Sequence, residues 1–248
     1  MKSKAVVFTA PGQLELREVS LRELDAHDVL VETFWTSISA GTEKMLFTGR
    51  LPKMQMTQYP VIPGYETVGK VIQIGSAVPE DYLGKFVYVS GSFGYTDVNA
   101  AFGGASQYIV SPYHKTTRLD ILNDVSLGLA LPLAATALHI VDLAAVAGKR
   151  ILVLGEGAVG LLVCDFARLF NAELIAATDL SDFRLSKSSA HLRINVAQTS
   201  LSDALGTTLF DVIIDCTGSM AAIEDSLRFL NMNGTLVLGG YYERIDLA

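Results

Sequence analysis

The residues best suited to carry chemistry form a glycine-rich motif in the second half of the sequence. Residues 155–160 read GEGAVG, a GxGxxG pattern that follows the apolar run ILVL and opens a helix-length segment. In such a turn Gly155 allows the tight bend, Gly157 lets a pyrophosphate approach the backbone, and Gly160 lets the helix lie close to the strand. The helix N-terminus offers N–H donors and partial positive charge to phosphate groups, so the motif predicts a dinucleotide site.

An acidic residue extends this pattern. Asp179 ends the next apolar run, LIAATD, about 20 residues after the glycines, where a carboxylate accepts both ribose hydroxyls and repels a 2′-phosphate. The pattern therefore predicts NAD rather than NADP. Arg184 lies nearby and could hold a phosphate, contact the ribose or pair with Asp179. The alternative is a nucleotide-free domain whose glycines serve packing.

Two later runs end in DCTG and LGGYY, at residues 215–218 and 238–242. The carboxyl ends of parallel strands form the ligand crevice of a doubly wound sheet, so both ends are candidates for the nicotinamide half of the cofactor, or simply turns. The cofactor-binding candidates are Gly155, Gly157, Val159, Gly160, Asp179, Arg184, Thr217, Gly218, Gly239 and Gly240.

The two halves of the sequence predict different structures around these motifs. From residue 4 to about 117, short runs rich in Val, Ile, Thr and aromatics are bounded by Gly, Pro or Asp, which is typical of an antiparallel barrel. Beyond about residue 120, helix-length segments alternate with apolar runs, which indicates a parallel sheet with crossover helices. We expect an α/β protein with a barrel domain at 1–122 and a Rossmann doubly wound domain at 123–248.

Composition excludes several classes of protein. The 248 residues carry a net charge of −7 with no basic block, which argues against a nucleic-acid partner. The two cysteines have no partner at metal-ligand spacing, so neither a disulfide framework nor a structural zinc is expected. The apolar stretch 127–141 is shorter than the roughly 20 residues that cross a bilayer, and it predicts a buried helix. With no signal-peptide pattern at the N-terminus, we expect a cytoplasmic protein.

A barrel joined to this nucleotide-binding half resembles the medium-chain dehydrogenase/reductase superfamily, with its GroES-like catalytic domain. In zinc-dependent members a CGTD-like turn and a GHE turn supply a cysteine and a histidine ligand. The matching stretches here, SAGTEK at 39–44 and PGYE at 63–66, place Ala40 and Tyr65 at those positions. The region of the third ligand, residues 129–139, has no Cys or Glu, and the four-cysteine lobe is missing. The resemblance implies a member with no metal.

A finer resemblance is to the bacteriochlorophyllide 3-hydroxyethyl dehydrogenase family of photosynthetic bacteria. It implies NAD-dependent oxidation of a 3-(1-hydroxyethyl) group to 3-acetyl in bacteriochlorophyll biosynthesis. The superfamily continues beyond its fifth sheet strand, so we expect a chain truncated at its carboxyl end. The stretches that resemble the family are ISAGTEKMLFTGRLP, YPVIPGYETVGKVIQIG, YTDVNAAFGGASQYIV and LAATALHIV.

Alcohol oxidation without zinc requires a side chain that accepts the proton. Tyr65, at the position of a zinc ligand, is the first catalytic candidate, and Thr42 matches the hydroxyl residue of the superfamily's proton relay. A phenol with a pKa near 10 needs either a lowered pKa or a relay to water. Glu66 could orient Tyr65 or join the relay, although its charge would raise the phenol's pKa. The other interpretation is that Tyr65 is an aromatic plug in the empty zinc cavity.

His139 is the remaining catalytic candidate, because its pKa lies naturally near neutrality; the alternative is a core or capping histidine. Two other functions stay open: a zinc-free NAD(P)H quinone or enone reductase, and a tetrapyrrole-binding carrier without turnover. An edge strand of the nucleotide-binding sheet could pair across a two-fold axis in a homodimer.

Overall fold

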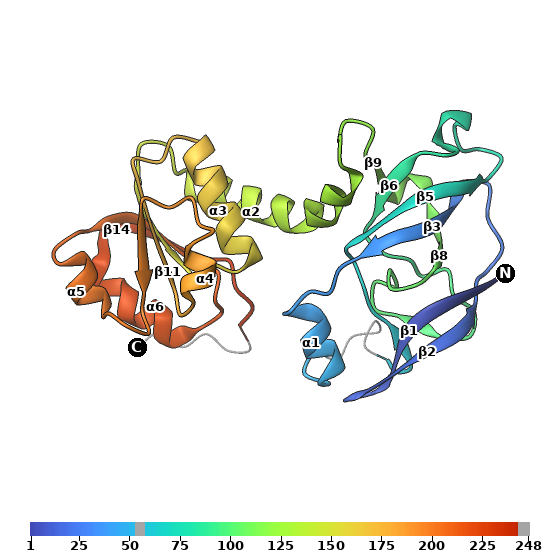
Figure 1. The fold of residues 1–248 in the computed structure, drawn as a ribbon, viewed down its shortest axis with the longest axis horizontal. Coiled ribbons are helices and arrows are strands. Elements are labelled where there is room, and N and C mark those ends of the chain that lie inside the picture. Colours follow the sequence, from blue (N-terminus) through green and yellow to red (C-terminus); the bar gives the residue numbers. More distant parts are fainter. Residues whose placement is uncertain (53–57, 243–248) are drawn as a thin grey trace. The chain divides into compact units, whose positions relative to one another are not determined.

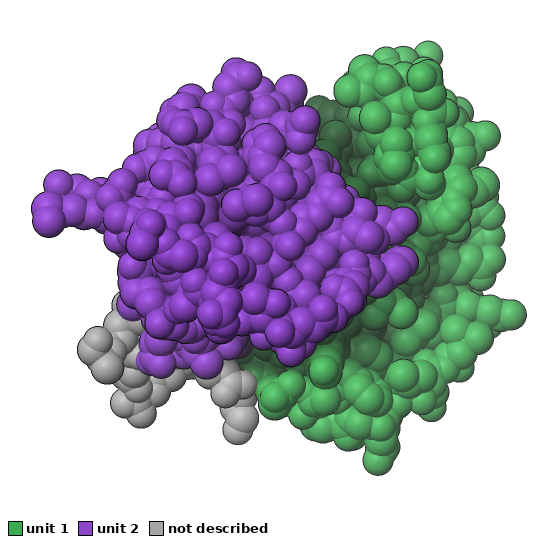
Figure 2. Space-filling view, turned by 60° about the vertical axis from the view of Figure 1, so that its left-hand side comes forward, with its two compact units in different colours: residues 1–132 green, residues 133–248 purple. Residues whose placement is uncertain are grey.

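The computed structural model describes residues 1–52 and 58–242, and the chain divides into two compact units, Met1–Pro132 and Leu133–Ala248 (Figures 1 and 2). Each unit buries hydrophobic clusters of its own. The 3₁₀ segment Val125–Ala130 packs on strands of the first unit, which is why the division by contacts falls later than residue 122. Residues 243–248 lie outside the described part of the chain. The expected truncation at the carboxyl end falls after these residues and so is not described by the structure.

The first unit is built from two mostly antiparallel sheets, with strand orders β2-β1-β4-β7 and β8-β3-β5-β6-β9. Alternate residues of the inner strand β3, Val29 and Val31, are fully buried, so one face of that sheet forms a core. The expected barrel-like, mostly antiparallel half is confirmed. Its elements are β1 (Lys2–Ala10), β2 (Gln13–Ser20), β3 (Asp28–Thr36), α1 (Thr42–Phe47), β4 (Val61–Ile62), β5 (Thr67–Ile74), β6 (Phe86–Val89), β7 (Asn99–Ala100), β8 (Tyr108–Pro112) and β9 (Thr116–Arg118).

The second unit is a five-stranded parallel sheet with the order β12-β11-β10-β13-β14. Ile151 and Val153 of β10 face a cluster with α2 and α3, while Leu152 and Leu154 face a cluster with α5 and α6, so helices cover both sides. The doubly wound sheet is confirmed. Its elements are α2 (Leu131–Ala144), β10 (Arg150–Leu154), α3 (Ala158–Leu169), β11 (Leu174–Asp179), α4 (Asp182–Leu185), β12 (Leu192–Asn195), α5 (Leu201–Leu205), β13 (Phe210–Asp215), α6 (Met220–Ser226) and β14 (Leu230–Leu238).

The apolar stretch around α2 is helical but only partly buried. Ala137 and Ile140 belong to the face that packs into the core, whereas Leu138 and Leu143 are exposed. The expectation of a buried helix therefore holds for one face alone, because a helix that packs against one sheet covers a single stripe. By length and composition Val125–Ala144 could cross a membrane, and 28% of its apolar window is buried; within the described residues it is the one such helix.

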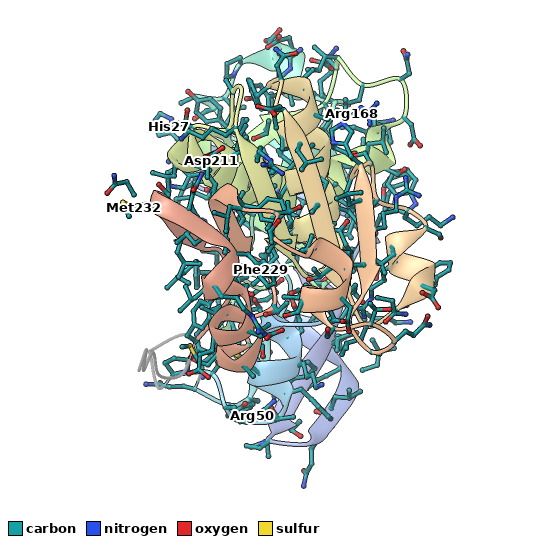
Figure 3. The ribbon with its side chains drawn as sticks, turned by 90° about the vertical axis from the view of Figure 1, so that its left-hand side faces the viewer. His27, Arg50, Arg168, Asp211, Phe229 and Met232 are labelled. Atoms are coloured by element: carbon teal, nitrogen blue, oxygen red, sulfur yellow. The ribbon has the colours of Figure 1, made fainter. Side chains whose placement is uncertain are left out.

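β14 forms one edge of the parallel sheet. Met232 near its start is 91% exposed and projects away from the ribbon in Figure 3, whereas Phe229 just before the strand is buried. An exposed edge leaves backbone groups unpaired, which makes β14 a candidate for pairing with another chain.

Candidate functional site

The glycine-rich turn joins β10 to α3, and each of its glycines has a different steric reason. Gly155 has a φ of +89°, and a Cβ there would lie 2.6 Å from Thr217 Cγ2. A Cβ on Gly160 would overlap the Gly155 carbonyl, so helix and strand approach closely only with glycine. At Gly157, the N-cap of α3, a Cβ would meet open space. The turn therefore leaves room for a ligand at the helix N-terminus, where Val159 lies half-buried in the first turn.

Asp179 ends β11 directly beside this turn. One carboxylate oxygen accepts the backbone N–H of Glu156 at 2.8 Å, and the other accepts that of Ser181 at 2.8 Å. Arg184 Nη1 lies 3.7 Å from the carboxylate, and its side chain is largely exposed. The pairing of Arg184 with Asp179, one of the sequence alternatives, is present. The acid is thus held against the turn where the ribose of a dinucleotide would lie.

Glu156 is a residue that the motif leaves unspecified. Its side chain is fully buried, Cys164 Sγ donates to its Oε1 at 3.4 Å, and Oε2 has no described hydrogen-bond partner. Burial raises the pKa of the Glu156 carboxyl, and the nearby Asp179 charge adds to the shift. A raised pKa favours the neutral form of Glu156, which reduces the repulsion between these two neighbouring acidic side chains.

The other cofactor candidates cluster at the carboxyl ends of β13 and β14. Asp215 is fully buried and organises them: it accepts the backbone N–H and hydroxyl of Thr217, the N–H of Gly218 and, through its own carbonyl, the N–H of Gly239. A Cβ on Gly240 would lie 2.7 Å from the Gly218 Cα, so these turns are in close contact. Sequence reasoning placed the glycines and Thr217 but missed Asp215, the group that holds them together.

In the first unit, Tyr65 lies half-buried just before β5. Its ring centroid is 5.2 Å from that of Phe102, and its carbonyl accepts the Tyr88 hydroxyl at 2.8 Å. The side chains of Ser39 and Thr42 lie near the phenol hydroxyl and lower its pKa. The structure therefore brings Tyr65 and Thr42 together, as expected, and adds Ser39 to the hydroxyl network.

Two buried carboxyl groups flank this network. Glu66 is 5% exposed; its Oε2 accepts the Ser37 hydroxyl, and its Oε1 is buried with no described hydrogen-bond partner. Glu43 on α1 is 6% exposed, and its Oε2 accepts the Ser39 backbone N–H at 3.0 Å. None of the ion pairs formed by the described residues includes either group. Glu66 was expected here, and Glu43 was missed.

Burial is the main influence on the pKa of the phenol, and these carboxyl groups add to it. Burial raises the pKa of Tyr65; the Ser39 and Thr42 hydroxyls oppose the shift, and the charges of Glu66 and Glu43 add to it. Burial also raises the pKa of Glu66, which the Tyr65 hydroxyl partly opposes. A simple tyrosinate base, which needs a lowered pKa, is therefore disfavoured.

The donor set of this site does not fit the superfamily's zinc. A catalytic zinc takes three ligands from His, Cys and carboxylate side chains. Ala40 has no donor atom, Tyr65 keeps its proton, and within residues 1–52 and 58–242 no group of three or more His, Cys, Asp or Glu could hold a metal ion. We derive no step through a metal.

His139 lies in the second unit, on an exposed part of α2. It is therefore not the core residue that its Ala/Leu-rich surroundings suggested, because it lies on the face of α2 that turns away from the buried stripe. Its assignment to the catalytic group stays a prediction.

Comparisons with known proteins match both units. A family model described as the alcohol dehydrogenase GroES-like domain matches residues 25–121, and one described as zinc-binding dehydrogenase matches residues 158–246. A putative zinc-binding dehydrogenase of Sinorhizobium meliloti, solved with NADP, is 24% identical with a TM-score of 0.86 and covers 100% of this chain and 80% of its own. Benzyl alcohol dehydrogenase of Acinetobacter calcoaceticus is 20% identical with a TM-score of 0.84, covering 97% of this chain and 77% of its own.

Two curated relatives are named 2-desacetyl-2-hydroxyethyl bacteriochlorophyllide A dehydrogenase. The protein of Cereibacter sphaeroides is 30% identical over 98% of this chain and 75% of its own length. That of Rhodobacter capsulatus is 27% identical over 98% of this chain and 74% of its own length. The chain therefore belongs to the bacteriochlorophyllide hydroxyethyl dehydrogenase family of the medium-chain dehydrogenase/reductase superfamily.

Proposed function

We propose that this protein oxidises the 3-(1-hydroxyethyl) group of a bacteriochlorophyllide to a 3-acetyl group, with NAD as hydride acceptor and without zinc. The observation that carries the proposal is the 30% identity, along 98% of the chain, to an enzyme named for this substrate. The hydroxyl and carboxyl network around Tyr65 supports it, because it provides proton-transfer groups where other members of the superfamily have metal ligands.

The preference for NAD rests on Asp179. Its carboxylate stands beside the glycine turn, where it would accept ribose hydroxyls and repel a 2′-phosphate. Arg184 pairs with this carboxylate, so the positive charge of Arg184 is partly neutralised. Open space at Gly157 and the N-terminus of α3 would hold the pyrophosphate, and the turns around Asp215 would border the nicotinamide half.

Bound nicotinamide would supply the hydride acceptor, and the chain's own residues would manage the proton. The raised pKa of Tyr65 keeps its O–H at neutral pH, so it can hydrogen-bond the substrate oxygen, with Ser39 and Thr42 beside it. Glu66 offers a free buried carboxyl oxygen next to this group. Oxidation of the alcohol requires such an acceptor as the C–O bond becomes a carbonyl.

The decisive assay incubates the full chain with 3-(1-hydroxyethyl) bacteriochlorophyllide a and either NAD or NADP, following pigment absorbance and reduced cofactor. Parent protein should turn over with NAD. Tyr65→Phe should lower kcat by about 10²–10⁴-fold, the usual contribution of a positioned proton-transfer group, without weakening NAD binding. Tyr108→Phe is the matched control. It removes a phenol oxygen from the same unit, and no hydrogen bond of that oxygen is described.

Other outcomes identify the alternatives. Pigment binding without reduction of either cofactor would favour a tetrapyrrole carrier. NADPH consumption with quinones or enones, and none with the alcohol, would favour the reductase. Undiminished turnover by Tyr65→Phe would make the tyrosine a plug of the cavity.

The proposed setting is a soluble enzyme in the cytoplasm, acting as a homodimer. The exposed edge of β14, with Met232 at its start, is the surface offered for the dimer contact.

A further inference from the structure

We propose that a pocket in the first unit, lined by Arg22, Ser111 and Lys115 among others, binds the carboxylate of an apolar organic acid. The inference assigns a ligand to residues that neither the cofactor site nor the proton-transfer group uses. Bacteriochlorophyllides carry a propionate side chain, so the proposed substrate is one source of such a carboxylate, and a separate organic acid is the other. The first source rests on the proposed function, whereas the second does not.

The pocket lies where the loop after β6 meets the end of β8. Its volume is about 440 Å³, which is within the range of small-molecule sites. Phe93, Val110 and Pro112 contribute apolar groups to its lining, and Phe93 is 67% exposed. A mostly apolar pocket with a few polar groups suits a ligand that carries a small polar end on an apolar body.

Close backbone contacts hold the loop that forms one wall of the pocket. The Ser92 N–H donates to the Phe102 carbonyl, and the Ser92 hydroxyl donates to the Val110 carbonyl at 2.5 Å. Gly91 has a φ of +132°, and a Cβ there would overlap the Phe102 carbonyl. The wall is therefore formed before any ligand arrives, which lowers the cost of ordering it on binding.

The charged residues of the lining are both cationic, and none of the described residues that line the pocket is acidic. Arg22 Nη1 lies 2.5 Å from the buried Asp28 carboxylate and 3.2 Å from that of Asp25, which fixes the guanidinium. Because Asp28 balances the charge of Arg22, the net positive charge comes from Lys115. Lys115 is exposed and belongs to none of the ion pairs formed by the described residues. A fixed guanidinium and an unpaired ammonium are donors that suit a carboxylate.

Ser111 adds a hydroxyl that has no described partner in the protein. It is 1% exposed, and its Oγ is buried without a described hydrogen bond. Ser92, in the same lining, differs because its Oγ also accepts the Gly94 N–H at 3.0 Å. An unpaired buried hydroxyl is costly, and rotation of the Ser111 side chain would let it donate to an anion in the pocket. The pocket therefore has a neutral donor as well as two cationic ones.

Phe102 links the pocket to the candidate catalytic tyrosine. It lines the pocket, and its ring centroid lies 5.2 Å from that of Tyr65. A ligand in the pocket and an alcohol beside Tyr65 would both have Phe102 as a neighbour. This shared neighbour makes the carboxylate of the substrate the first source to test.

The first test needs no pigment. Ligand-observed NMR titration of the full chain measures the binding of 3-phenylpropionate and of its neutral amide, 3-phenylpropionamide. The acid should bind about tenfold more tightly than the amide, because hydrogen bonds to a charged group are stronger than neutral ones. Equal affinities, or no saturable binding of the acid, would overturn the proposal.

Variants locate the bound carboxylate. Lys115→Gln should weaken binding of the acid by about fivefold or more and leave the amide unchanged. The control Lys4→Gln, which removes another exposed lysine of the first unit, should bind the acid as the parent does. Acid binding that survives Lys115→Gln would place the acid elsewhere and sink the assignment.

Ser111→Ala separates a ligand contact from a structural role. Because the hydroxyl has no described partner to lose, the variant should keep the thermal unfolding temperature of the parent while its affinity for the acid falls. A lower unfolding temperature with unchanged affinity would show that Ser111 serves the fold alone and would remove it from the site.

The second test identifies the source of the carboxylate. It compares KM for 3-(1-hydroxyethyl) bacteriochlorophyllide a and for its propionate methyl ester in the parent and in Lys115→Gln. If the pocket holds the propionate, the variant should raise KM for the acid several-fold, with little change in kcat or in KM for the ester. If 3-phenylpropionate binding depends on Lys115 but KM does not, the ligand is a separate organic acid. A protein that binds 3-phenylpropionate as described but oxidises neither pigment would contradict the proposed function and leave the pocket assigned.

Discussion

The backbone N–H of Glu156 donates to the Asp179 carboxylate at 2.8 Å, which ties the end of β11 to the glycine turn after β10. Asp179→Asn keeps the acceptor for this hydrogen bond and removes the charge that would repel a 2′-phosphate. NAD binding should weaken about tenfold or more, because hydrogen bonds to a charged group contribute roughly 1.5–3 kcal/mol, and NADP binding should improve. Calorimetric titration with both cofactors measures the change.

The matched control for this variant is Asp165→Asn on the exposed side of α3, which should leave both affinities as in the parent. An unchanged NAD-to-NADP ratio in Asp179→Asn would remove the basis for the NAD preference.

Adding the same methyl group at Gly157 and at Gly160 should have different effects on stability and on NAD binding. Gly157→Ala places it in open space, so the free energy of unfolding should change by less than about 0.5 kcal/mol while NAD binding weakens, since the pyrophosphate would need that space. Gly160→Ala drives it into the Gly155 carbonyl and should cost about 1–3 kcal/mol or more. Chemical denaturation and NAD titration of both variants separate the roles. Equal destabilisation by both would contradict this geometry.

Replacing Glu43 should change the stability of the protein by an amount that depends on pH. Its pKa is raised from 4.5 to about 7 by burial. Between these values the unfolded chain releases the proton and the folded chain retains it, so the native state loses stability as pH rises, and the loss is complete above about pH 7. Glu43→Gln should therefore unfold several degrees higher than the parent at pH 8 and at the same temperature at pH 4, because 1 kcal/mol corresponds to about 2–8 °C.

Fluorescence of Trp35, the single tryptophan, reports this transition from the same unit as Glu43. A variant whose advantage is equal at pH 4 and pH 8 would show that Glu43 does not titrate as described. Glu18→Gln should give no pH-dependent difference.

The proposed dimer can be tested at the edge strand β14. If two copies pair along this strand, Met232→Lys places a charge beside the contact and should shift light-scattering mass toward the monomer. Ile121→Lys, at a side chain that is 92% exposed in the first unit, is the control. A parent that is monomeric at assay concentration would exclude the dimer.

The second unit followed closely from its sequence. Apolar runs alternating with helix-length segments define the parallel sheet, and the GxGxxG motif places its turn, because both patterns arise from local chain geometry. Asp215 escaped notice although it stands within the DCTG stretch. The sequence does not distinguish an acidic residue at a strand end that contacts a ligand from one that holds its own loop by hydrogen bonds. Asp215 is of the second kind.

The catalytic region of the first unit could be predicted only in part. Tyr65, Glu66 and Thr42 were found through resemblance at two short motifs. Glu43 was missed because α1 spans six residues, too few for a hydrophobic period to reveal which side chain is buried. The raised pKa of Tyr65 is likewise a product of tertiary burial, which no spacing of residues reports.

The buried sulfur of Cys164 beside Glu156 has a practical consequence. Burial raises the pKa of this thiol, so the reactive thiolate is scarce in the folded state, and the side chain is 0% exposed. Alkylating reagents therefore reach it only when the second unit opens. The alkylation rate of Cys164, followed by mass spectrometry, therefore reports how often the second unit opens. A dinucleotide that binds the closed unit will lower this alkylation rate.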